Sequence, residues 1–425
     1  MNMKLSFRNF FCFELLFILF LFSPQYKNSL TSYIRIDLTL LLSLIVMPIG
    51  YYLMVKESRT RSKSGTKYSS IATKILFLTF TGWCCYRSFG LPVTEYPYSK
   101  ILCFFLYTMQ AFFLSYLVIA RDENRLCRFM LLTLIFAVAI NFECYRIFLS
   151  QIQNRAALND VLGNNYLITG QTLGIGVVIL SGILLTRANT SGCQIYLGQS
   201  NAGAAIWTIL LLSMVYMSLN LGGRGPVASM MLATAALGTL SLLYAENKAF
   251  GRMLKNIAYF TLVLCILYLL MELMLKTGRQ SALIKRINFD YLQNDESILL
   301  RIKYYKNAWK CFLEHCFTGV GFGGWPYYQG SGDMYCHPHN IFLEVLCETG
   351  LAGFTLFIAL LSSIFARLNI QKLATSPLIR IFLCVFMFCF INALKSGDLN
   401  DNIALFCYLG IAAGILESST KIPQT

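Results

Sequence analysis

The sequence predicts an all-α polytopic membrane protein with about 12 transmembrane helices. Of its 425 residues, 56% are hydrophobic and only 13% are charged, whereas a soluble globular chain carries about 25% charged residues. The mean hydropathy is +0.59. Apolar runs of about 20 residues recur from end to end, and a run of that length crosses a hydrocarbon core of about 30 Å. A β-barrel would show short alternating segments instead.

Each expected span is an apolar run between polar or charged residues. In chain order the runs cover residues 9–24, 36–55, 71–91, 101–120, 129–149, 166–186, 203–220, 226–245, 256–275, 341–366, 380–395 and 402–417. The first run follows Lys4 and Arg8 and resembles a signal peptide. No small-residue cleavage site follows it, so we expect it to remain as a membrane helix. Glycines recur between residues 187 and 225, which leaves a broken or re-entrant helix open there.

Lysine and arginine in the short loops set the orientation, because they concentrate on the cytoplasmic side. With the N-terminus inside, the cytoplasmic loops are rich in them, as in the run from Lys56 to Lys67. The short outer loops hold few: Lys27, Arg35, Lys100, Arg146, Arg155, Arg224 and Lys395. We expect cytoplasmic termini, helices 1–9 within residues 1–275, a large periplasmic loop at 276–340 and helices 10–12 within 341–425.

The net charge of +15 follows from these loops and does not indicate nucleic-acid binding. The fifteen cysteines lie mostly inside apolar runs, where cysteine acts as a small apolar residue. No Cys-x-x-Cys pair occurs, which disfavours a zinc or iron–sulfur site. Cys311, Cys316 and Cys336 fall in the polar outer loop, where two of them can form a disulfide.

The outer loop is unusually basic for its side of the membrane. Long loops cross largely regardless of charge, so the orientation stands. Asp295 to Leu313 shows helical spacing of apolar residues, with Ile298, Ile302, Tyr305 and Trp309 on one face. Such an amphipathic helix can lie on membrane lipid with its lysines toward lipid phosphates. The loop also contains the three arginines Arg279, Arg286 and Arg301, and a guanidinium fits a phosphate in bidentate geometry.

Two glycine-rich segments are expected on the outer face. The junction Asn220-Leu221-Gly222-Gly223-Arg224-Gly225-Pro226 places Pro226 in the first turn of the next helix, whose N-terminus favours an anion. A lone Arg224 can equally reach toward lipid headgroups. The segment Phe317-Thr318-Gly319-Val320-Gly321-Phe322-Gly323-Gly324-Trp325 predicts a turn-rich lid or saddle, and it lacks the Lys-Ser/Thr ending of a phosphate-binding P-loop.

Two of the three histidines lie in His337-Pro338-His339-Asn340, where the polar loop meets an apolar run. Histidine exchanges a proton near neutral pH, so the segment suggests chemistry at a membrane surface. Asn340 suits the cap of the following helix. Glu344 and Glu348 follow at helical spacing, and carboxylates within a span usually face a bundle interior or a wet cavity. Pro338 is expected to direct the two histidines differently.

Together these segments resemble the O-antigen ligase and O-antigen polymerase superfamily over roughly residues 160–360. Gly223-Arg224-Gly225 is similar to the family's outer-junction arginine, although serine often precedes that arginine. Arg301, Trp309 and Gly319-Val320-Gly321-Phe322-Gly323 resemble its periplasmic loop. The His-Asn-x-x-Leu…Glu-x-Gly-x-x-Gly segment is matched by His339, Asn340, Leu343, Glu348, Gly350 and Gly353.

The resemblance implies a metal-independent, inverting glycosyltransferase without cofactor in the bacterial cytoplasmic membrane, with its active site toward the periplasm or cell exterior. The donor would be a glycan on undecaprenyl diphosphate, and the acceptor a sugar hydroxyl of lipid A–core or of another lipid-linked glycan. Arginines near the diphosphate would stabilise its growing charge, and a neutral histidine would take the hydroxyl proton. The expected catalytic residues are His339, Arg224 and Arg301, and the expected substrate-binding residues are Arg279, Arg286, His337, Asn340 and Glu348.

Two other classes of function compete with the transferase. A transporter or flippase for lipid-linked sugars would place paired charges near the middle of several spans, whereas the ionisable residues here gather at the outer face. A non-enzymatic scaffold gives no reason for the arginines and His339-Asn340 to share one side. Between ligase and polymerase, which share one chemistry, the segment ending in Gly350-x-x-Gly353 leans toward ligase.

Overall fold

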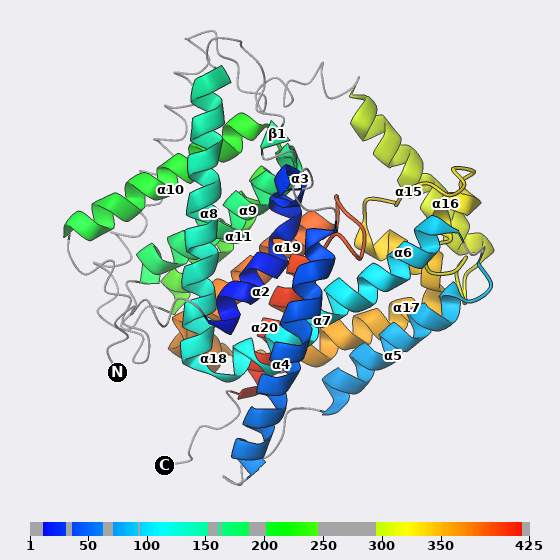
Figure 1. Ribbon diagram of the computed structural model, residues 1–425, viewed down its shortest axis with the longest axis horizontal. Helices are drawn as coiled ribbons and strands as arrows, with labels where there is room; N and C mark the ends of the chain where they lie inside the picture. The colour runs from blue at the N-terminus through cyan, green and yellow to red at the C-terminus, as the bar shows by residue number, and fades with distance from the viewer. Residues whose placement is uncertain are drawn as a thin grey trace. The chain divides into compact units, whose positions relative to one another are not determined.

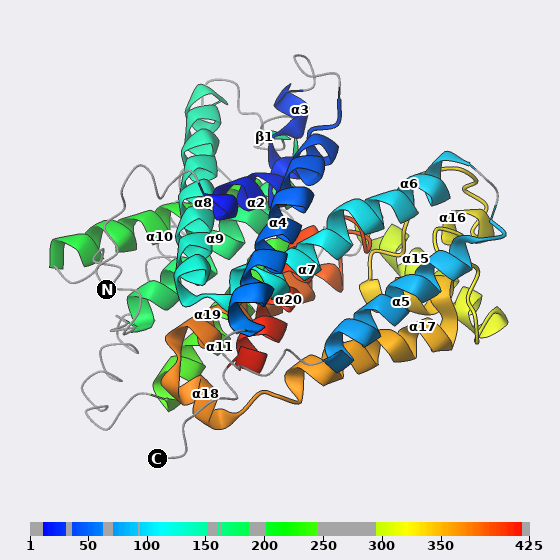
Figure 2. The ribbon, with the colours of Figure 1, turned by 60° about the horizontal axis from the view of Figure 1, so that its bottom comes forward.

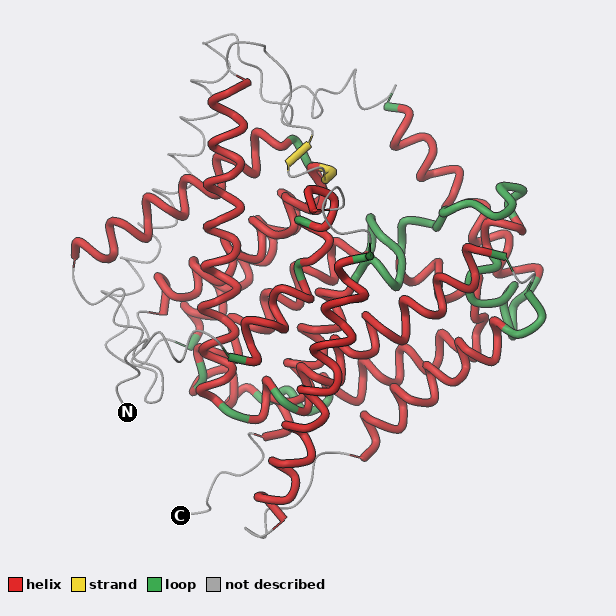
Figure 3. Tube along the Cα trace, viewed as in Figure 1, coloured by secondary structure: helices red, strands yellow, loops and turns green. Residues whose placement is uncertain are grey.

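The computed structural model describes residues 12–30, 36–62, 71–91, 94–151, 160–161, 164–186, 201–244 and 295–418. Helices make up nearly all of this described chain (Figure 3). The only sheet in these ranges is the short antiparallel pair of β1 (Asp160–Val161) and β2 (Asn164–Asn165). The all-α prediction is confirmed for the described residues.

The predicted spans fall on helices, except residues 256–275, which lie outside the described residues. Seven described segments are long and apolar enough to cross a membrane, and they include Glu95–Arg121 and Ile341–Phe365. The first span is observed only as the short α2 (Phe13–Leu21), because the chain turns into the 3₁₀ segment Ser23–Gln25, which contains Pro24. Of the region 187–225, in which the sequence left a broken or re-entrant helix open, residues 187–200 lie outside the described residues, and Asn201–Leu221 forms one continuous helix.

The chain divides into two compact units, each assembled from distant parts of the sequence. The first unit comprises Met1–Thr39, Asp122–Gln293 and Asn369–Cys389, and the second comprises Leu40–Arg121, Asn294–Leu368 and Phe390–Thr425. The first unit contains α2, α3 (Lys27–Leu30), α8 (Glu123–Gln151), α9 (Tyr166–Thr186), α10 (Asn201–Leu221), α11 (Arg224–Leu243), α18 (Ile370–Thr375) and most of α19 (Pro377–Ala393).

In the first unit, α9 packs against α8, α10 and α11 (Figure 1). Small residues on a membrane helix let its neighbours approach closely. Gly176 illustrates this, since a Cβ there would lie 2.5 Å from the methyl of Met214 and 2.6 Å from the Cβ of Ala137. Glycine in the middle of α9 therefore sets the spacing of this bundle.

The second unit carries the residues that the sequence predicts around the histidines. It contains most of α4 (Leu38–Ser62), then α5 (Ile71–Ser88), α6 (Glu95–Cys103), a π turn (Phe104–Thr108), α7 (Met109–Leu117), a 3₁₀ turn (Ile119–Arg121), α15 (Glu296–Glu314), α16 (Trp325–Tyr328), α17 (Ile341–Phe365) and α20 (Ile403–Ser418). Helix α5 runs along α17, and α7 along α20 (Figures 1 and 2). Stacked rings of Phe77 and Phe112, with centroids 4.1 Å apart, lie in its core.

Helix α17 is interrupted at Gly350, whose φ is 68° and ψ −170°. The turn that follows α15 pairs with the backbone groups on both sides of this break. Val320 and Gly321 donate N–H bonds to the carbonyls of Cys347 and Glu348, both at 2.9 Å. In return, Leu351 donates to the carbonyl of Cys316 at 2.7 Å. A non-helical backbone is tolerated in a membrane protein only where protein or water satisfies it, and here the glycine-rich turn does so.

The glycine-rich segment is therefore a wedge in the broken helix rather than a lid. At Gly319, a Cβ would lie 2.4 Å from the backbone carbon of Glu348, and its φ is +66°. Two side chains of α5 hold the same region: Arg87 donates to the carbonyls of Thr318 and Gly319 at 2.8 and 3.0 Å. Trp83 donates to the carbonyl of Thr349 at 2.9 Å.

Candidate active site

The loop before α17 brings His337 and His339 into contact. Their ring centroids are 4.2 Å apart in an edge-to-face arrangement. Pro338 was expected to direct the two rings differently, but they meet, and His339 after it has a left-handed backbone (φ 57°). A left-handed non-glycine residue is uncommon and is often found at functional sites. His337 is only 6% exposed, and His339 is partly exposed.

Three ring nitrogens of the histidine pair are buried without hydrogen-bond partners among the described residues. They are both nitrogens of His337 and Nδ1 of His339. Burial lowers the pKa of His337 to about 4, with Asp398 opposing and the positive charges of Lys100 and Arg301 adding to the effect. Burial and the nearby Arg301 lower the pKa of His339 to about 4, against the pull of Asp398. Both rings are therefore neutral near pH 7, able to accept a proton.

Two positive side chains share the surroundings of the histidines. Arg301, on α15, acts electrostatically on His339 and on Lys395. Burial and this repulsion lower the pKa of Lys395 to about 8. Like charges that approach each other in a protein attract an anion, because each stabilises it and an anion relieves their repulsion. This part of the second unit is therefore suited to an anionic group beside a neutral base.

Helix α15 forms the wall next to the histidines. It begins where predicted, with Asp295 as its cap, accepting from the Ser297 N–H at 2.9 Å. The predicted apolar face is not the one packed inside the protein, since Ile302 and Trp309 are 44% and 49% exposed. The smaller Ala308 and Cys311 allow close approach and pack beside Trp325 and Cys347 instead. The ring of Tyr304 stacks on His339 with centroids 6.0 Å apart.

The cysteines of this region are not paired. Cys311, Cys316 and Cys336 are all free, so the structure contains none of the disulfides that the sequence left open among them. Cys311 lies in the apolar cluster with Cys347, and Cys336 packs against that cluster. Their role here is packing between α15 and the start of α17.

Asn340 caps α17 as predicted. Its side-chain oxygen accepts from the N–H groups of Phe342 and Leu343 at 3.0 and 3.1 Å. Its side-chain nitrogen donates to the carbonyl of Leu394 at 3.0 Å. The cap therefore fixes the residue after His339 to the segment that carries Lys395. Its assignment to substrate binding stays a prediction.

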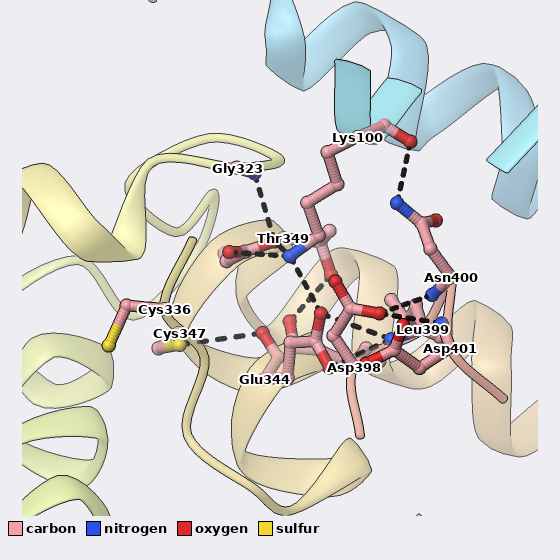
Figure 4. A network of polar contacts seen from close by, with 12 residues as sticks. Lys100, Gly323, Cys336, Glu344, Cys347, Thr349, Asp398, Leu399, Asn400 and Asp401 are labelled. Atoms are coloured by element: carbon pink, nitrogen blue, oxygen red, sulfur yellow. Dashed lines mark hydrogen bonds and ion pairs between the residues drawn. The ribbon is translucent and has the colours of Figure 1, made fainter. Parts of the chain in front are cut away.

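A buried ion cluster lies in the first turns of α17. Lys100 of α6 approaches Glu344 at 2.7 Å and Glu348 at 2.8 Å, and all three side chains are fully buried. The expectation that carboxylates here face the interior is confirmed. Figure 4 shows Lys100 and Glu344 with the backbone of Gly323 and Leu399 gathered around the cluster. Glu348 was predicted to bind substrate; in the described chain its oxygens accept from Lys100 and Gly323.

The predicted arginines are distributed over different parts of the chain. Arg224 is the first residue of α11 in the first unit, after the cap Gly223 and Gly222 (φ 72°), with Pro226 in the first turn as expected. Arg301 belongs to the second unit with the histidines. Arg279 and Arg286 lie outside the described residues. The roles assigned to these arginines stay predictions.

Three functional candidates were missed from the sequence. Lys100 and Lys395 were counted only as outer-loop charges, and Asp398 was not singled out. Asp398 is fully buried, with Oδ1 accepting from the N–H groups of Asn400 and Asp401 and Oδ2 unpartnered among the described residues. Lys100 could have been sought from the two carboxylates that it binds. Glu344 and Glu348 lie one helical turn apart within a span, and buried carboxylates need a cation nearby.

Residues 206–358 match the family model described as O-Antigen ligase. This match confirms the resemblance to the O-antigen ligase superfamily for residues 206–358 of the chain. The matched segment contains Arg224, Arg301, both histidines of the site and the break in α17, whereas Lys100 and Lys395 lie outside it. A search of curated proteins found no match. The match broadly supports a membrane glycosyltransferase of ligase or polymerase type.

Proposed function

We propose that this protein transfers a glycan from undecaprenyl diphosphate to a hydroxyl group of an acceptor sugar at the periplasmic face of the bacterial inner membrane. In the form that we favour, the acceptor is lipid A–core and the protein is a ligase. The observation that carries the proposal is the contact between two neutral histidines, His337 buried and His339 partly exposed, near the positive charge of Arg301, which also acts on Lys395. Both histidines and Arg301 lie in the segment that matches the O-antigen ligase family.

In the proposed step, His339 accepts the proton of the acceptor hydroxyl while that oxygen attacks the anomeric carbon of the donor glycan. The carbon–oxygen bond to the diphosphate breaks, and the diphosphate leaves with the bonding electrons. Attack from the face opposite the leaving group inverts the anomeric configuration. A histidine poised in this way contributes a rate factor of about 10²–10⁴. Its neutral state at pH 7 supports this role for His339.

Arg301 and Lys395 are proposed to bind the diphosphate. Positive groups placed where charge develops stabilise the transition state more than the ground state, so protein side chains can supply the charge without a metal. Arg224, which the family resemblance adds to this set, is proposed for the same task. Replacing Arg224 or Arg301 by Ala is expected to raise KM for the donor and to lower kcat.

The proposal is tested by transfer with purified protein and by glycan products in a deletion strain. Transfer from a synthetic undecaprenyl-diphosphate glycan to lipid A–core supports the ligase, and a strain without the gene then accumulates long chains not attached to lipid A–core. Single repeat units on the acceptor in that strain indicate a polymerase that joins lipid-linked repeats. Flipping of labelled donor across vesicles without any transfer would refute both.

The pH dependence of transfer should show the titration of His339 and of Lys395. In the free enzyme, kcat/KM is expected to fall below about pH 4, as His339 becomes protonated, and above about pH 8, as Lys395 loses its proton. A bound diphosphate favours the protonated form of both groups. We therefore expect both limbs of the kcat profile, which reports the complex, to lie at higher pH than those of kcat/KM.

Lys395→Met provides the control for the alkaline limb. It should remove that limb from the kcat/KM profile and leave the acidic limb near pH 4, because the histidines keep Arg301 and Asp398 as neighbours. An alkaline limb that persists unchanged in Lys395→Met would exclude Lys395 as its source. An acidic limb near pH 6.5 would show that His339 is not held in the neutral form by burial.

A further inference from the structure

Lys100 is a fully buried cation outside the chemistry proposed so far. Its ammonium nitrogen is 2.7 Å from an oxygen of Glu344 and 2.8 and 2.9 Å from the two oxygens of Glu348. Glu344 and Glu348 lie one turn apart on α17, so a single ammonium contacts two turns of that helix. None of the three side chains is exposed to solvent.

Each carboxylate also binds a backbone N–H from a different segment. Glu348 accepts from Gly323, at the end of the glycine-rich wedge, at 2.9 Å. Glu344 accepts from Leu399 at 3.1 Å. The carbonyl of Lys100 itself accepts from the side chain of Asn400 at 2.8 Å, so α6 is tied to the same turn (Figure 4). Four segments thus meet at one ammonium: α6, the start of α17, the wedge and the turn at residues 398–402.

These segments border the histidine pair. His337 and His339 directly precede α17, and Asn340 links that helix start to Leu394. Asp398, next to Leu399 in the turn, acts electrostatically on both histidines. The turn is also connected to the histidine loop by the hydrogen bond of Tyr335 to Asp401. A shift of the turn or of the helix start would therefore move the base and the charges that face it.

Charge makes Lys100 necessary for this arrangement. A buried carboxylate is unstable unless it is paired and hydrogen-bonded. Glu344, Glu348 and Asp398 are all fully buried, and Lys100 is the cation in contact with the first two. Without its ammonium, Glu344 and Glu348 would repel each other across one turn of α17, and the contacts with Gly323 and Leu399 would be strained.

We propose that Lys100 is a positioning residue for glycan transfer, which holds the 398–402 turn and the start of α17 in place beside His337 and His339 through Glu344 and Glu348. The inference rests on the proposed function. Lys100 does not touch the reacting atoms in this scheme. It acts by fixing the geometry of the base, and it contributes one of the positive charges that act on the neighbouring His337.

The test compares Lys100→Met with wild-type protein in purified transfer assays over a range of pH. We expect kcat to fall by about 10²-fold, the scale for a reacting group displaced by about 1 Å. The acidic limb of kcat/KM, which His339 sets, should move to higher pH, because a displaced helix start leaves His339 less buried and burial is the main cause of its lowered pKa. The charged and titratable groups that continue to act on or contact the histidines are Arg301, Asp398, Tyr304 and Tyr335.

A second variant separates positioning from folding. Lys100→Met combined with Glu348→Gln leaves a single carboxylate and keeps an oxygen that accepts from Gly323. Because it has one buried carboxylate fewer without a cation, this double variant is expected to melt at a higher temperature than Lys100→Met, yet to retain a kcat at least 10-fold below wild type, since the ammonium no longer joins α6 to α17. Lys100→Arg keeps the charge and should keep the acidic limb while losing part of kcat. If the double variant has the kcat and acidic limb of wild type, Lys100 only balances charge and the inference is wrong.

Arg121→Met is the matched control. It breaks another ion pair of the second unit, between Arg121 and Glu417 at 3.0 Å. Glu417 lies near the end of α20, about 20 Å along the helix from the 398–402 turn, at 1.5 Å per residue. This variant should not move the acidic limb. Absence of transfer by the wild-type protein would refute the proposed function itself, whereas an active wild type with an unaffected double variant would overturn the inference about Lys100 alone.

Discussion

Replacing His339 by Asn is expected to lower kcat for glycan transfer by about 10²–10⁴-fold, the range for loss of a general base. Asn suits this position because it adopts the left-handed backbone that His339 has (φ 57°) more readily than most residues. It removes the group that accepts the proton without forcing the loop to change. His339→Ala should lose a similar factor, together with a small loss of stability from the strained backbone.

The other two histidines provide the comparison. His315 is exposed at the end of α15, where its ring contacts that of Tyr328, so His315→Ala should transfer at the wild-type rate. His337 packs its ring on His339 and on Tyr335, so His337→Ala should lose activity through a displaced base and also lower the melting temperature. Full activity in His339→Asn with none in His337→Ala would reverse the assignment of the base.

Local sequence signals were sufficient for the elements around this site. The cap Asn340 and the start of α15 at Asp295 were predicted because a helix start needs only a polar side chain before a helical pattern, and a cap needs only a side-chain oxygen and free N–H groups within three residues. The glycine-rich segment was recognised as turns, and the carboxylates at 344 and 348 as residues that face the interior. Each of these features depends on a few consecutive residues, so the sequence contains the whole of the signal.

Other features of the site depend on contacts between distant segments. Lys100 is separated by more than 240 residues from the carboxylates that it binds, and as an isolated residue it resembles any interfacial lysine. The contact of His337 with His339 depends on one left-handed residue that no local pattern requires. The sequence predicted helix α15 with one apolar face, but helix spacing does not tell which face meets protein and which stays exposed, and the small Ala308 and Cys311 decided it.

The break in α17 is the feature whose disruption should have the largest effect on stability. Residues 341–366 were predicted as one span because their hydropathy is continuous, and hydropathy does not register a single left-handed residue. The break exists because the N–H groups and carbonyls that it frees are satisfied by the turn after α15. Gly350 allows both the change in backbone direction within α17 and the close approach of the turn after α15.

Gly350→Ala is expected to destabilise the protein by more than about 3 kcal/mol, since a left-handed alanine alone costs about 1–3 kcal/mol and the new Cβ would also lie 2.4 Å from the backbone oxygen of Phe317. Relief of that overlap requires the wedge to move, with loss of the bond from Leu351 to Cys316. Thermal unfolding of the purified protein should show a clear drop in Tm, with loss of transfer even below the new Tm.

Gly82→Ala, in α5 of the same unit, is the control. Nothing lies within 4 Å of a Cβ at Gly82, and its backbone is helical, so this substitution should be neutral or stabilise by up to about 1 kcal/mol. Equal melting temperatures for Gly350→Ala and wild type would mean that α17 can close into a regular helix without the wedge. In that case Glu348 and Gly323 would separate, and the ion cluster of Lys100 would have to be held by α17 and the 398–402 turn alone.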